Sequence, residues 1–412
     1  MEKELVSKLI EDIKQRLISD IDLQSDPTDE DVKEKIEDMV FLHSKQFSLT
    51  IKETESIIDT VFNSMRRLDV LQPFIEDESL TEIMVNGPDY IFVEKDGQLR
   101  LTNVKFESKK KLEDTIIRIV SRVNRVVNES SPIVDARLAD GSRINVVLPP
   151  VALNGPILTI RKFRKEAMTM GDLISYNSIS SEVAATLQSM VRAKYNIFVC
   201  GGTGSGKTTF LNVLSNYIPK DERIITIEDS AELRLVGLNN LISLEARNQN
   251  MEGKGEISIR DLIKTSLRMR PDRIIVGEVR GPEAIDMLQA MNTGHDGSLS
   301  TGHSNSTKDM LSRLETMVLS GMDIPLVAIR QQIVSAIDIL IFVSRLRDRT
   351  RKVLEVTEVL SLDNGEIKLN PLYQFQETGE TSDGKIVGKL FRTGNKMSHT
   401  NKFVLAGIKP NL

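Results

Sequence analysis

The stretch that decides the fold is Gly201-Gly202-Thr203-Gly204-Ser205-Gly206-Lys207-Thr208. It fits the pattern G-x-x-x-x-G-K-[ST], in which glycines let the backbone curl so that its N–H groups point at phosphate oxygens. A short apolar run, residues 196–200, comes directly before it, and residues 209–211 continue as a helix would. A loop between a buried strand and the positive end of a helix dipole favours phosphate, so the sequence predicts that this chain binds a nucleoside triphosphate.

Each residue of this loop has an expected part in binding ATP and Mg²⁺. The ammonium of Lys207 is expected on the β- and γ-phosphates, and the hydroxyl of Thr208 on Mg²⁺. The other residues expected to bind the nucleotide are Gly202, Thr203, Gly204, Ser205, Gly206 and Thr209. A glycine-rich turn that matches the pattern by chance is the competing interpretation, and the strand before the loop and the helix after it argue against that.

Apolar runs further along the chain, at residues 224–227 and 274–276, indicate two more buried strands. Strands that alternate with helices are typical of an α/β fold with a mostly parallel sheet covered on both faces. We therefore expect an N-terminal helical domain over residues 1–72, a small α/β domain over 73–165, a linker over 166–178, the α/β core over 179–362 and a C-terminal tail over 363–412.

The N-terminal part of the chain shows two kinds of periodicity. Apolar residues recur every three to four positions in residues 5–21, 32–40 and 50–71, which predicts three amphipathic helices. Their polar faces are rich in Asp and Glu, so packing against each other is favoured over lying on a membrane surface. The small α/β domain has predicted strands at 83–85, 91–93, 99–101, 137–138, 143–146 and 158–161, with a helix over 110–127 and Asp-Gly turns at 96–97 and 140–141.

The composition is that of a globular protein and disfavours several classes. The formal net charge of −5 and the pI of about 5.7 argue against a broad nucleic-acid-binding surface. The single cysteine, Cys200, can form neither an intrachain disulfide nor a thiolate zinc cluster, and it indicates a reducing compartment. No secretory leader can be drawn at Met1, and no run approaches the roughly 18 apolar residues needed to cross a bilayer. We expect a cytosolic protein without direct membrane insertion.

Carboxylates stand where the predicted strands end. Glu228, Asp229 and Glu232 follow the strand at 224–227, and Glu278 follows the next one. Ligands bind at the carboxyl ends of strands in open α/β sheets, and hydrolysis needs a carboxylate that orients or deprotonates water. Any one of these acids could instead be a solvated loop residue. Their place behind a phosphate-binding loop favours catalytic roles for Glu232 and Glu278.

Two of the four histidines, His295 and His303, fall in a glycine-rich stretch at residues 294–303. Three glycines in these ten residues predict neither a plain helix nor a plain strand. A polar loop that senses the γ-phosphate is favoured over a structural loop. A metal site is disfavoured because cysteine partners and a third histidine are lacking. His43 and His399 are expected to be surface or packing residues.

Four blocks in this order resemble the Walker A, Asp box, Walker B and His box of the type II/IV secretion ATPase superfamily: residues 201–208, 227–233, 267–281 and 294–303. Within it, the chain most resembles the CpaF-type ATPases of tight-adherence (Flp) pilus assembly. That narrower resemblance is carried by residues 80–87 (LTEIMVNG), 138–145 (LADGSRIN) and 148–150 (LPP). It covers roughly residues 71–358 and implies a RecA-like P-loop ATPase domain preceded by a small PAS-like α/β domain.

The resemblance also implies roles for individual residues. Glu232 would be the general base that activates the attacking water, and Glu278 would hold Mg²⁺ through water. His295 and His303 would couple the γ-phosphate to conformational change. Arg137, Arg143 and Arg161 match positions at which the family brings arginines onto the phosphates, with surface arginines at strand edges as the alternative. Arg268, Arg270 and Arg280 are expected to serve a subunit interface or the structure itself.

The function implied by the resemblance is that of a hexameric motor ATPase. Such a homo-hexameric ring would sit at the cytoplasmic face of the inner membrane and act on a polytopic membrane protein at the pilus base. Pilus extension and retraction both stay open, as does secretion. A nucleic-acid translocase of RecA-like fold and a non-hydrolysing, nucleotide-gated scaffold are the alternatives. The absence of aromatic platforms disfavours the first, and the carboxylates of the site disfavour the second. A small-molecule kinase and an ABC-type ATPase are weaker alternatives.

Overall fold

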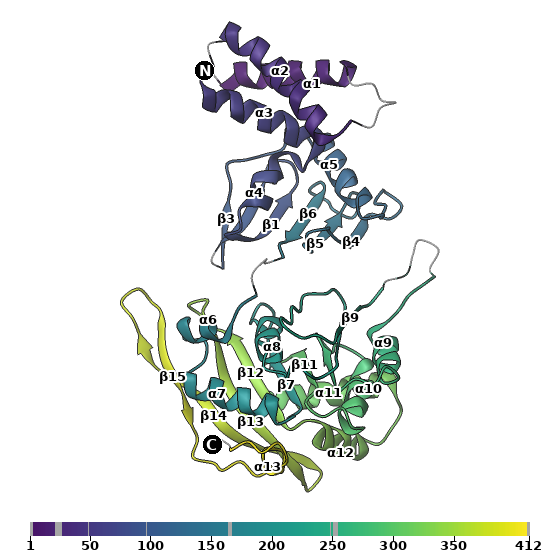
Figure 1. The fold of residues 1–412 in the computed structure, drawn as a ribbon, viewed down its shortest axis with the longest axis vertical. Coiled ribbons are helices and arrows are strands. Elements are labelled where there is room, and N and C mark those ends of the chain that lie inside the picture. Colours follow the sequence, from purple (N-terminus) through teal and green to yellow (C-terminus); the bar gives the residue numbers. More distant parts are fainter. Residues whose placement is uncertain are drawn as a thin grey trace. The chain divides into compact units, whose positions relative to one another are not determined.

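The computed structural model describes residues 3–20, 27–47, 49–95, 97–163, 167–247, 249 and 254–409. Its contacts divide the chain into two compact units, Met1–Arg164 and Lys165–Leu412 (Figure 1). Each unit has its own buried cores and is described by itself.

The first unit begins with the three predicted helices, α1 (Lys3–Asp20), α2 (Asp29–Phe47) and α3 (Ile51–Arg66). Their apolar faces meet in one buried cluster that includes Ile13, Ile36 and Val61, none of them exposed to solvent. The packing of these helices on each other is therefore confirmed. Each helix has an apolar stripe on one face, and the three stripes cover one another.

The predicted helix over 50–71 is wrong at its C-terminal end. Helix α3 starts at the Thr50 capping box and ends at Arg66. Asp69 then takes a φ of 55°, which a continuing right-handed helix does not allow, and the chain passes into a 3₁₀ turn, η1 (Asp69–Leu71), and α4 (Gln72–Glu76). The guanidinium of Arg118 donates to the carbonyls of Ser64 and Met65, at 2.9 and 3.1 Å, and so caps the end of α3.

The rest of the first unit is a six-stranded antiparallel sheet with the order β3-β2-β1-β6-β5-β4. Its strands are β1 (Leu80–Asn86), β2 (Ile91–Lys95), β3 (Gln98–Leu101), β4 (Ile133–Arg137), β5 (Arg143–Val147) and β6 (Ile157–Arg161). Helix α5 (Lys109–Ser121) adds Leu112 and Ile116 to the core of this sheet. It is shorter than the predicted 110–127 because the chain turns at Asn124, where φ is 54°.

The second unit is built on a nine-stranded sheet with the order β15-β14-β13-β12-β7-β11-β10-β8-β9. Strands β7 (Ile197–Gly201), β8 (Ile224–Glu228), β9 (Leu241–Glu245), β10 (Arg273–Val276), β11 (Leu299–His303) and β12 (Ile339–Arg345) run parallel. Strands β13 (Arg351–Asp363), β14 (Glu366–Glu380) and β15 (Ile386–Arg392) continue the sheet antiparallel. Much of the segment that we expected to be a tail thus forms strands.

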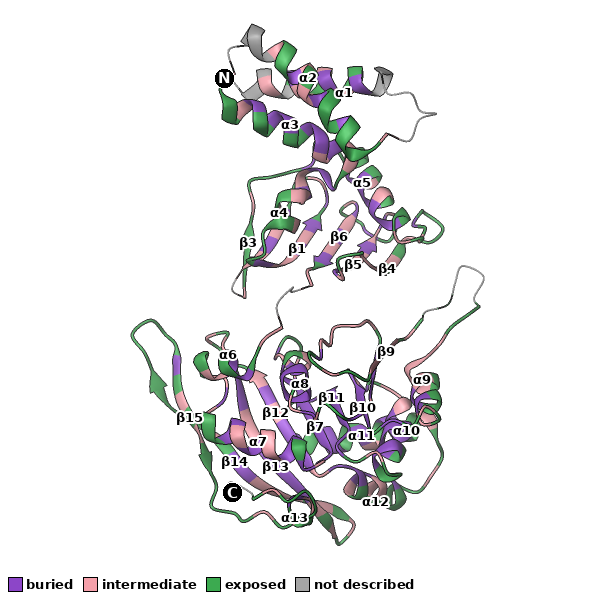
Figure 2. Ribbon diagram, viewed as in Figure 1, coloured by how far each residue is buried: buried purple, intermediate pink, exposed green. Residues whose placement is uncertain are grey.

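Helices cover both faces of this sheet, and the strands between them are buried (Figure 2). One core contains α6 (Met170–Ser175), α7 (Ser181–Arg192), α8 (Lys207–Ser215) and the short C-terminal α13 (Asn401–Leu405). The other contains α9 (Ile259–Ser266), α10 (Glu283–Asn292), α11 (Thr307–Gly321) and α12 (Leu326–Ala336). The predicted α/β class with a mostly parallel sheet is confirmed.

The prediction that residues 294–303 form neither helix nor strand is wrong for their second half. Residues 299–303 form β11, which is inserted between β7 and β10. The hydroxyls of Ser300 and Thr301 donate to the carbonyls of Val276 and Gly277, at 3.0 and 2.7 Å. These buried polar side chains therefore keep hydrogen-bond partners in place of water. A Cβ at Gly302 would lie 2.9 Å from both Phe198 and Met310, so close packing accounts for this glycine.

Candidate functional site

The glycine-rich loop joins the buried strand β7 to helix α8, as the sequence predicted. Gly204 and Gly206 have φ values of 68° and 93°, which residues with a side chain rarely adopt. At Gly201, a Cβ would lie 2.1 Å from the carbonyl oxygen of Val343. The loop is therefore shaped by its glycines into a turn at the N-terminus of α8, where helix N–H groups and the dipole attract an anion.

Lys207 is 7% exposed, and its ammonium is held inside the loop. It donates to the carbonyl of Gly202 at 3.0 Å and lies 3.2 Å from Nδ1 of His303. His303 reaches it because β11 pairs in parallel with β7, with His303 opposite Gly201. The structure therefore brings His303 to the phosphate-binding loop, as the sequence predicted.

The contacts continue from His303 to the carboxylate of Glu278. Nε2 of His303 lies 2.7 Å from Oε1 of Glu278, and the guanidinium of Arg280 donates to Oε2 of Glu278 at 2.7 Å. Nδ1 can accept the hydrogen bond from Lys207 only while it carries no proton, and Nε2 lies within ion-pair distance of Oε1 of Glu278 without a hydrogen bond between them. Lys207, His303, Glu278 and Arg280 thus form one continuous chain of side chains, hereafter the Lys207–Arg280 chain.

Burial, and after it the positive charge of Lys207, lowers the pKa of His303 from its ordinary 6.5. The carboxylate of Glu278 acts in the opposite direction and only partly offsets them. The lowered pKa favours the neutral imidazole, which is the form that can accept the hydrogen bond from Lys207.

Three carboxylates surround Arg280. The hydrogen bond that Arg280 donates to Glu278, together with the charges of Glu278, Asp229 and Glu232, raises the pKa of this guanidinium despite its partial burial. Nη1 of Arg280 lies 3.8 Å from Oδ2 of Asp229. The acids that the sequence placed at the ends of β8 and β10 are thus gathered around one cation. Arg280 was expected to serve an interface or the structure, and here it bonds to a predicted catalytic acid.

Glu228 has a different environment from the other acids. It is the last residue of β8, is 4% exposed and accepts hydrogen bonds from the backbone of Glu232 at 2.7 Å and of Leu233 at 3.0 Å. In the sequence, Glu228 is one of several acids that follow the strand, and the pattern does not distinguish acids that hold the structure from those that take part in catalysis. Glu228 is thus held by backbone donors, whereas Glu232 is only half-buried, and its role as the catalytic acid stays a prediction.

His295 lies away from the Lys207–Arg280 chain. It precedes β11, at the end of that strand where Leu299 pairs with Ile197, whereas His303 stands at the other end beside Gly201. Nδ1 of His295 lies 3.2 Å from the carbonyl of Ala290, at the end of α10. The structure does not bring His295 to the phosphate-binding loop, and its role as a sensor stays a prediction.

The predicted arginines of the first unit lie in one row. Arg137 on β4 is directly opposite Arg143 on β5, which is directly opposite Arg161 on β6. Side chains at directly opposite positions share a face of the sheet, with Cβ atoms about 5 Å apart, and like charges placed so are destabilising. Glu82 is 4.0 Å from Arg161, and the ring of Phe163 lies 5.7 Å from the guanidinium carbon of Arg137. Three cations in a row are suited to a polyanion.

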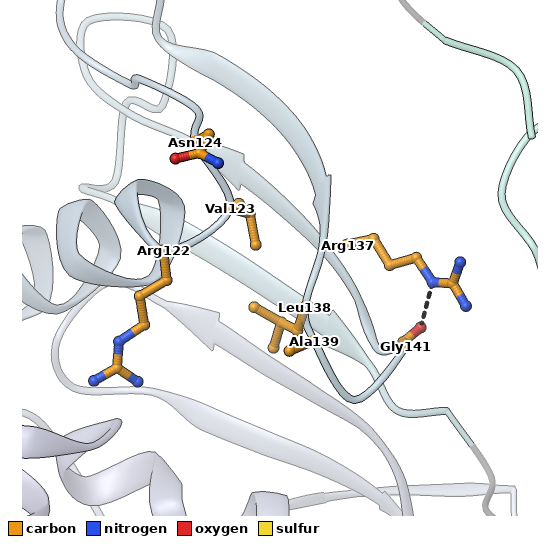
Figure 3. Close-up of a pocket in the computed structure, with 7 residues that line it drawn as sticks. All are labelled: Arg122, Val123, Asn124, Arg137, Leu138, Ala139 and Gly141. Carbon is orange, nitrogen blue, oxygen red and sulfur yellow. Dashed lines mark hydrogen bonds between the residues drawn. The ribbon is translucent and has the colours of Figure 1, made fainter.

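A cavity of about 480 Å³ opens beside this row. It is lined by Arg122, Val123, Asn124, Arg137, Leu138, Ala139 and Gly141. Figure 3 shows the guanidinium of Arg137 turned to the carbonyl of Gly141, 3.4 Å from its Nε, and that of Arg122 on the other side of Leu138 in this view. The two charged groups do not converge on one point, so the cavity itself is no anion site.

One residue at the phosphate-binding loop was missed by the sequence. Nε of Arg351, the first residue of β13, donates to the carbonyl of Gly204 at 2.8 Å. A Cβ added at Gly206 would lie 3.4 Å from Cδ of Arg351. Arg351 adds a positive charge and a brace to the loop. No local signal could reveal it, because 147 positions separate the two residues and only the sheet brings them together.

The chemistry of the loop fits a nucleotide with Mg²⁺. Among the described residues, no three His, Cys, Asp or Glu side chains are arranged to hold a metal ion. Mg²⁺ commonly takes most of its oxygens from phosphates and water, with one or two from protein. The hydroxyl of Thr208 and the carboxylate of Glu278 would supply the protein's part. No helix in the described part of the chain is long and apolar enough to cross a membrane.

The fold defines the class: an α/β protein with a RecA-like domain, whose sheet carries the glycine-rich loop, preceded by an N-terminal domain. More narrowly, the chain belongs to the type II/IV secretion system protein family, whose sequence model matches residues 65–381. The resemblance noted in the sequence is thereby confirmed at the level of the family.

Several relatives belong to secretion and conjugation systems. A Mycobacterium tuberculosis protein provisionally named for conjugal transfer is 34% identical over 79% of this chain and 93% of its own length. The type IV secretion system protein PtlH of Bordetella pertussis is 31% identical over 68% of this chain and 89% of its own. The type IV secretion system protein VirB11 of Bartonella henselae is 29% identical over 73% of this chain and 93% of its own length.

Solved structures share the fold. The ATPase DotB of Legionella pneumophila has a TM-score of 0.50 at 21% identity, over 70% of this chain and 79% of that one. The pilus retraction motor PilT with bound ADP has a TM-score of 0.50 at 18% identity, over 82% of this chain and 87% of that one. At these identities the likeness concerns the fold alone.

The contact between Lys207 and His303 predicts a shift that NMR can measure. Replacing Lys207 by Met removes one of the two groups that lower the pKa of His303 most, so that pKa should rise. The burial that also lowers this pKa persists in the variant. A titration of histidine-labelled protein from about pH 5 to about pH 8 would show this, with the signal of His399 as internal control. An unchanged pKa for His303 would contradict the contact.

The same pKa gives the sign of a stability effect. The pKa of His303 in the folded protein lies below its ordinary 6.5. At pH values between the lowered pKa and 6.5, the unfolded chain therefore binds more protons than the folded protein. The contribution of His303 to stability is therefore complete above about pH 6.5 and is lost as the pH falls through the lowered value.

Proposed function

We propose that this protein hydrolyses ATP with Mg²⁺ and uses the energy to drive assembly of a type IV or Flp-like pilus, or secretion. The observation that carries the proposal is the Lys207–Arg280 chain, which connects the phosphate-binding loop to the carboxylate that follows β10. A site that only binds nucleotide needs the loop and not the acids. The family to which the chain belongs, that of type II/IV secretion system proteins, supports the link to secretion.

In the proposed reaction each residue has one task. Lys207 and the loop N–H groups hold the β- and γ-phosphates, and Thr208 holds Mg²⁺. Glu278 orients a water of the Mg²⁺ shell, and Glu232 takes the proton of the attacking water. His303 couples the position of Lys207 to that of Glu278, because its imidazole contacts both side chains.

We further propose a homo-hexameric ring that works through a polytopic membrane protein at the cytoplasmic face of the membrane. The CpaF-like blocks at residues 80–87, 138–145 and 148–150 favour the Flp pilus. Secretion is the second candidate, because PtlH and VirB11 carry the name of type IV secretion systems. Neither nucleic acid nor direct insertion into a bilayer is part of the proposal.

Two substitutions separate binding from hydrolysis. Lys207→Ala should abolish nucleotide binding. Glu232→Gln should bind ATP normally and lower kcat by about 10²–10⁴-fold, since Gln cannot accept the proton of the attacking water. Phosphate release and binding of a fluorescent ATP analogue measure both quantities. Full turnover by the Gln variant would refute Glu232 as the base, and full turnover by the Ala variant would place the site elsewhere.

The arginine row is proposed to stabilise the charge that develops on the γ-phosphate. Arg143→Gln and Arg161→Gln should each lower kcat by about 10²-fold or more and change nucleotide affinity much less, since arginines with this task act in the transition state. Arg100→Gln, on the exposed strand β3 at the far edge of the same sheet, is the matched control. Normal kcat in both variants would favour the alternative of surface arginines.

A ring motor should be sensitive to defective subunits. When Glu232→Gln protein is mixed with the normal protein and allowed to exchange, turnover should fall more than in proportion to the fraction of variant, because subunits of a ring act in concert. Steady-state phosphate release against mixing ratio measures this, alongside the mass in solution with and without an ATP analogue. A strictly proportional decrease would count against the ring.

A further inference from the structure

The loop that carries Glu232 has no regular secondary structure, yet its backbone is held by side chains. The N–H of Glu232 donates to Oε2 of Glu228 at 2.7 Å, and the N–H of Leu233 donates to the same oxygen at 3.0 Å. The N–H of Arg234 donates to Oδ1 of Asn212 at 2.8 Å. The N–H of Val236 donates to Oδ1 of Asn216 at 3.0 Å. Four N–H groups within five residues thus end on side-chain oxygens.

These acceptors come from two elements that belong to the phosphate site. Glu228 ends β8, whereas Asn212 lies in α8, the helix that begins at Lys207. Asn216 caps the same helix, and its amide donates to the carbonyl of Asn212 at 3.1 Å. The loop of Glu232 is therefore fastened to the phosphate-binding helix on one side and to the end of the neighbouring strand on the other.

Both inner acceptors are buried. Asn212 is 8% and Glu228 is 4% exposed. Room for Glu228 depends on Gly277, since a Cβ there would lie 2.9 Å from Cγ of Glu228. Gly277 directly precedes Glu278 in the sequence, so Glu228 packs against the backbone that carries the second catalytic acid. Hydrogen bonds from N–H groups to a carboxylate are about twice as strong as neutral ones, which suits Glu228 to fix a loop.

We propose that Asn212 and Glu228 are positioning residues for the general base. They set the place of Glu232 by holding the backbone on both sides of its Cα, and Asn212 ties that place to the helix that starts at Lys207. The inference rests on the proposed function, in which Glu232 activates water. A misplacement of about 1 Å can cost a reaction about 10²-fold, so loss of one anchor should appear in kcat.

The first test compares two replacements of Asn212. Asn212→Leu has nearly the same shape and no acceptor, and should lower kcat by about 10–100-fold with KM for MgATP within about twofold of normal. Asn212→Asp keeps an acceptor oxygen for the N–H of Arg234 and should retain most of kcat. Asn240→Leu is the control, because Asn240 accepts from the side chain of Arg223 and not from this loop. Normal kcat in Asn212→Leu would overturn the proposal.

A second test distinguishes positioning from a general loss of stability. In a Glu232→Gln background, Asn212→Leu should lower turnover no further, because there is no base left to position. A multiplicative loss in the double variant would overturn the proposal. If Asn212→Leu fails to fold, Glu228→Gln takes its place: it keeps the shape of Glu228, weakens the anchor, and should lower kcat without changing nucleotide affinity.

The outcomes keep this inference apart from the proposed function. Full activity of Glu232→Gln would refute the assignment of the base, and with it the premise. A slow Glu232→Gln together with normal kcat in Asn212→Leu and Glu228→Gln would refute the positioning role alone.

Discussion

The buried ammonium of Lys207 is the constraint on which the site depends. A charge that is 7% exposed is costly unless it is hydrogen-bonded, and the surrounding structure supplies acceptors from two places. One is the carbonyl of Gly202 in the same loop, and the other is His303, 96 positions further along the chain. The second exists only because β11 is inserted beside β7. Close packing at Gly302 and the buried hydroxyls of Ser300 and Thr301 make that insertion possible.

The same constraint extends to the acids. His303 can accept from Lys207 only as a neutral imidazole, and its other nitrogen lies 2.7 Å from Oε1 of Glu278. In the proposed reaction a triphosphate competes with His303 for Lys207, so binding at the loop is transmitted to Glu278 through one ring. Arg280 holds the other oxygen of Glu278 and draws Asp229 toward it.

The sequence predicted the elements whose signals are local. Residues 201–208, the runs that became β8 and β10, and the N-terminal amphipathic helices were all found, because glycine patterns and apolar periodicity act over a few residues. Helix ends were missed at Arg66 and Ser121, where residues in left-handed conformations, Asp69 and Asn124, end the pattern. The strand β11 was missed because Gly302 has low strand propensity and its neighbours are polar, whereas pairing with β7 and β10 on either side stabilises the strand.

The sequence by itself determined the class of chemistry. The order of Gly, Lys and Thr in the loop is typical of phosphate binding, and the acids that follow apolar runs are typical of hydrolysis beside it. The tertiary structure decided which of those residues meet. It brought His303 and not His295 to Lys207, buried Glu228 while leaving Glu232 accessible, and added Arg351 and Asn212, which no motif contains. The physical reason is that strand order and register set these distances, and both depend on contacts between residues far apart in the chain.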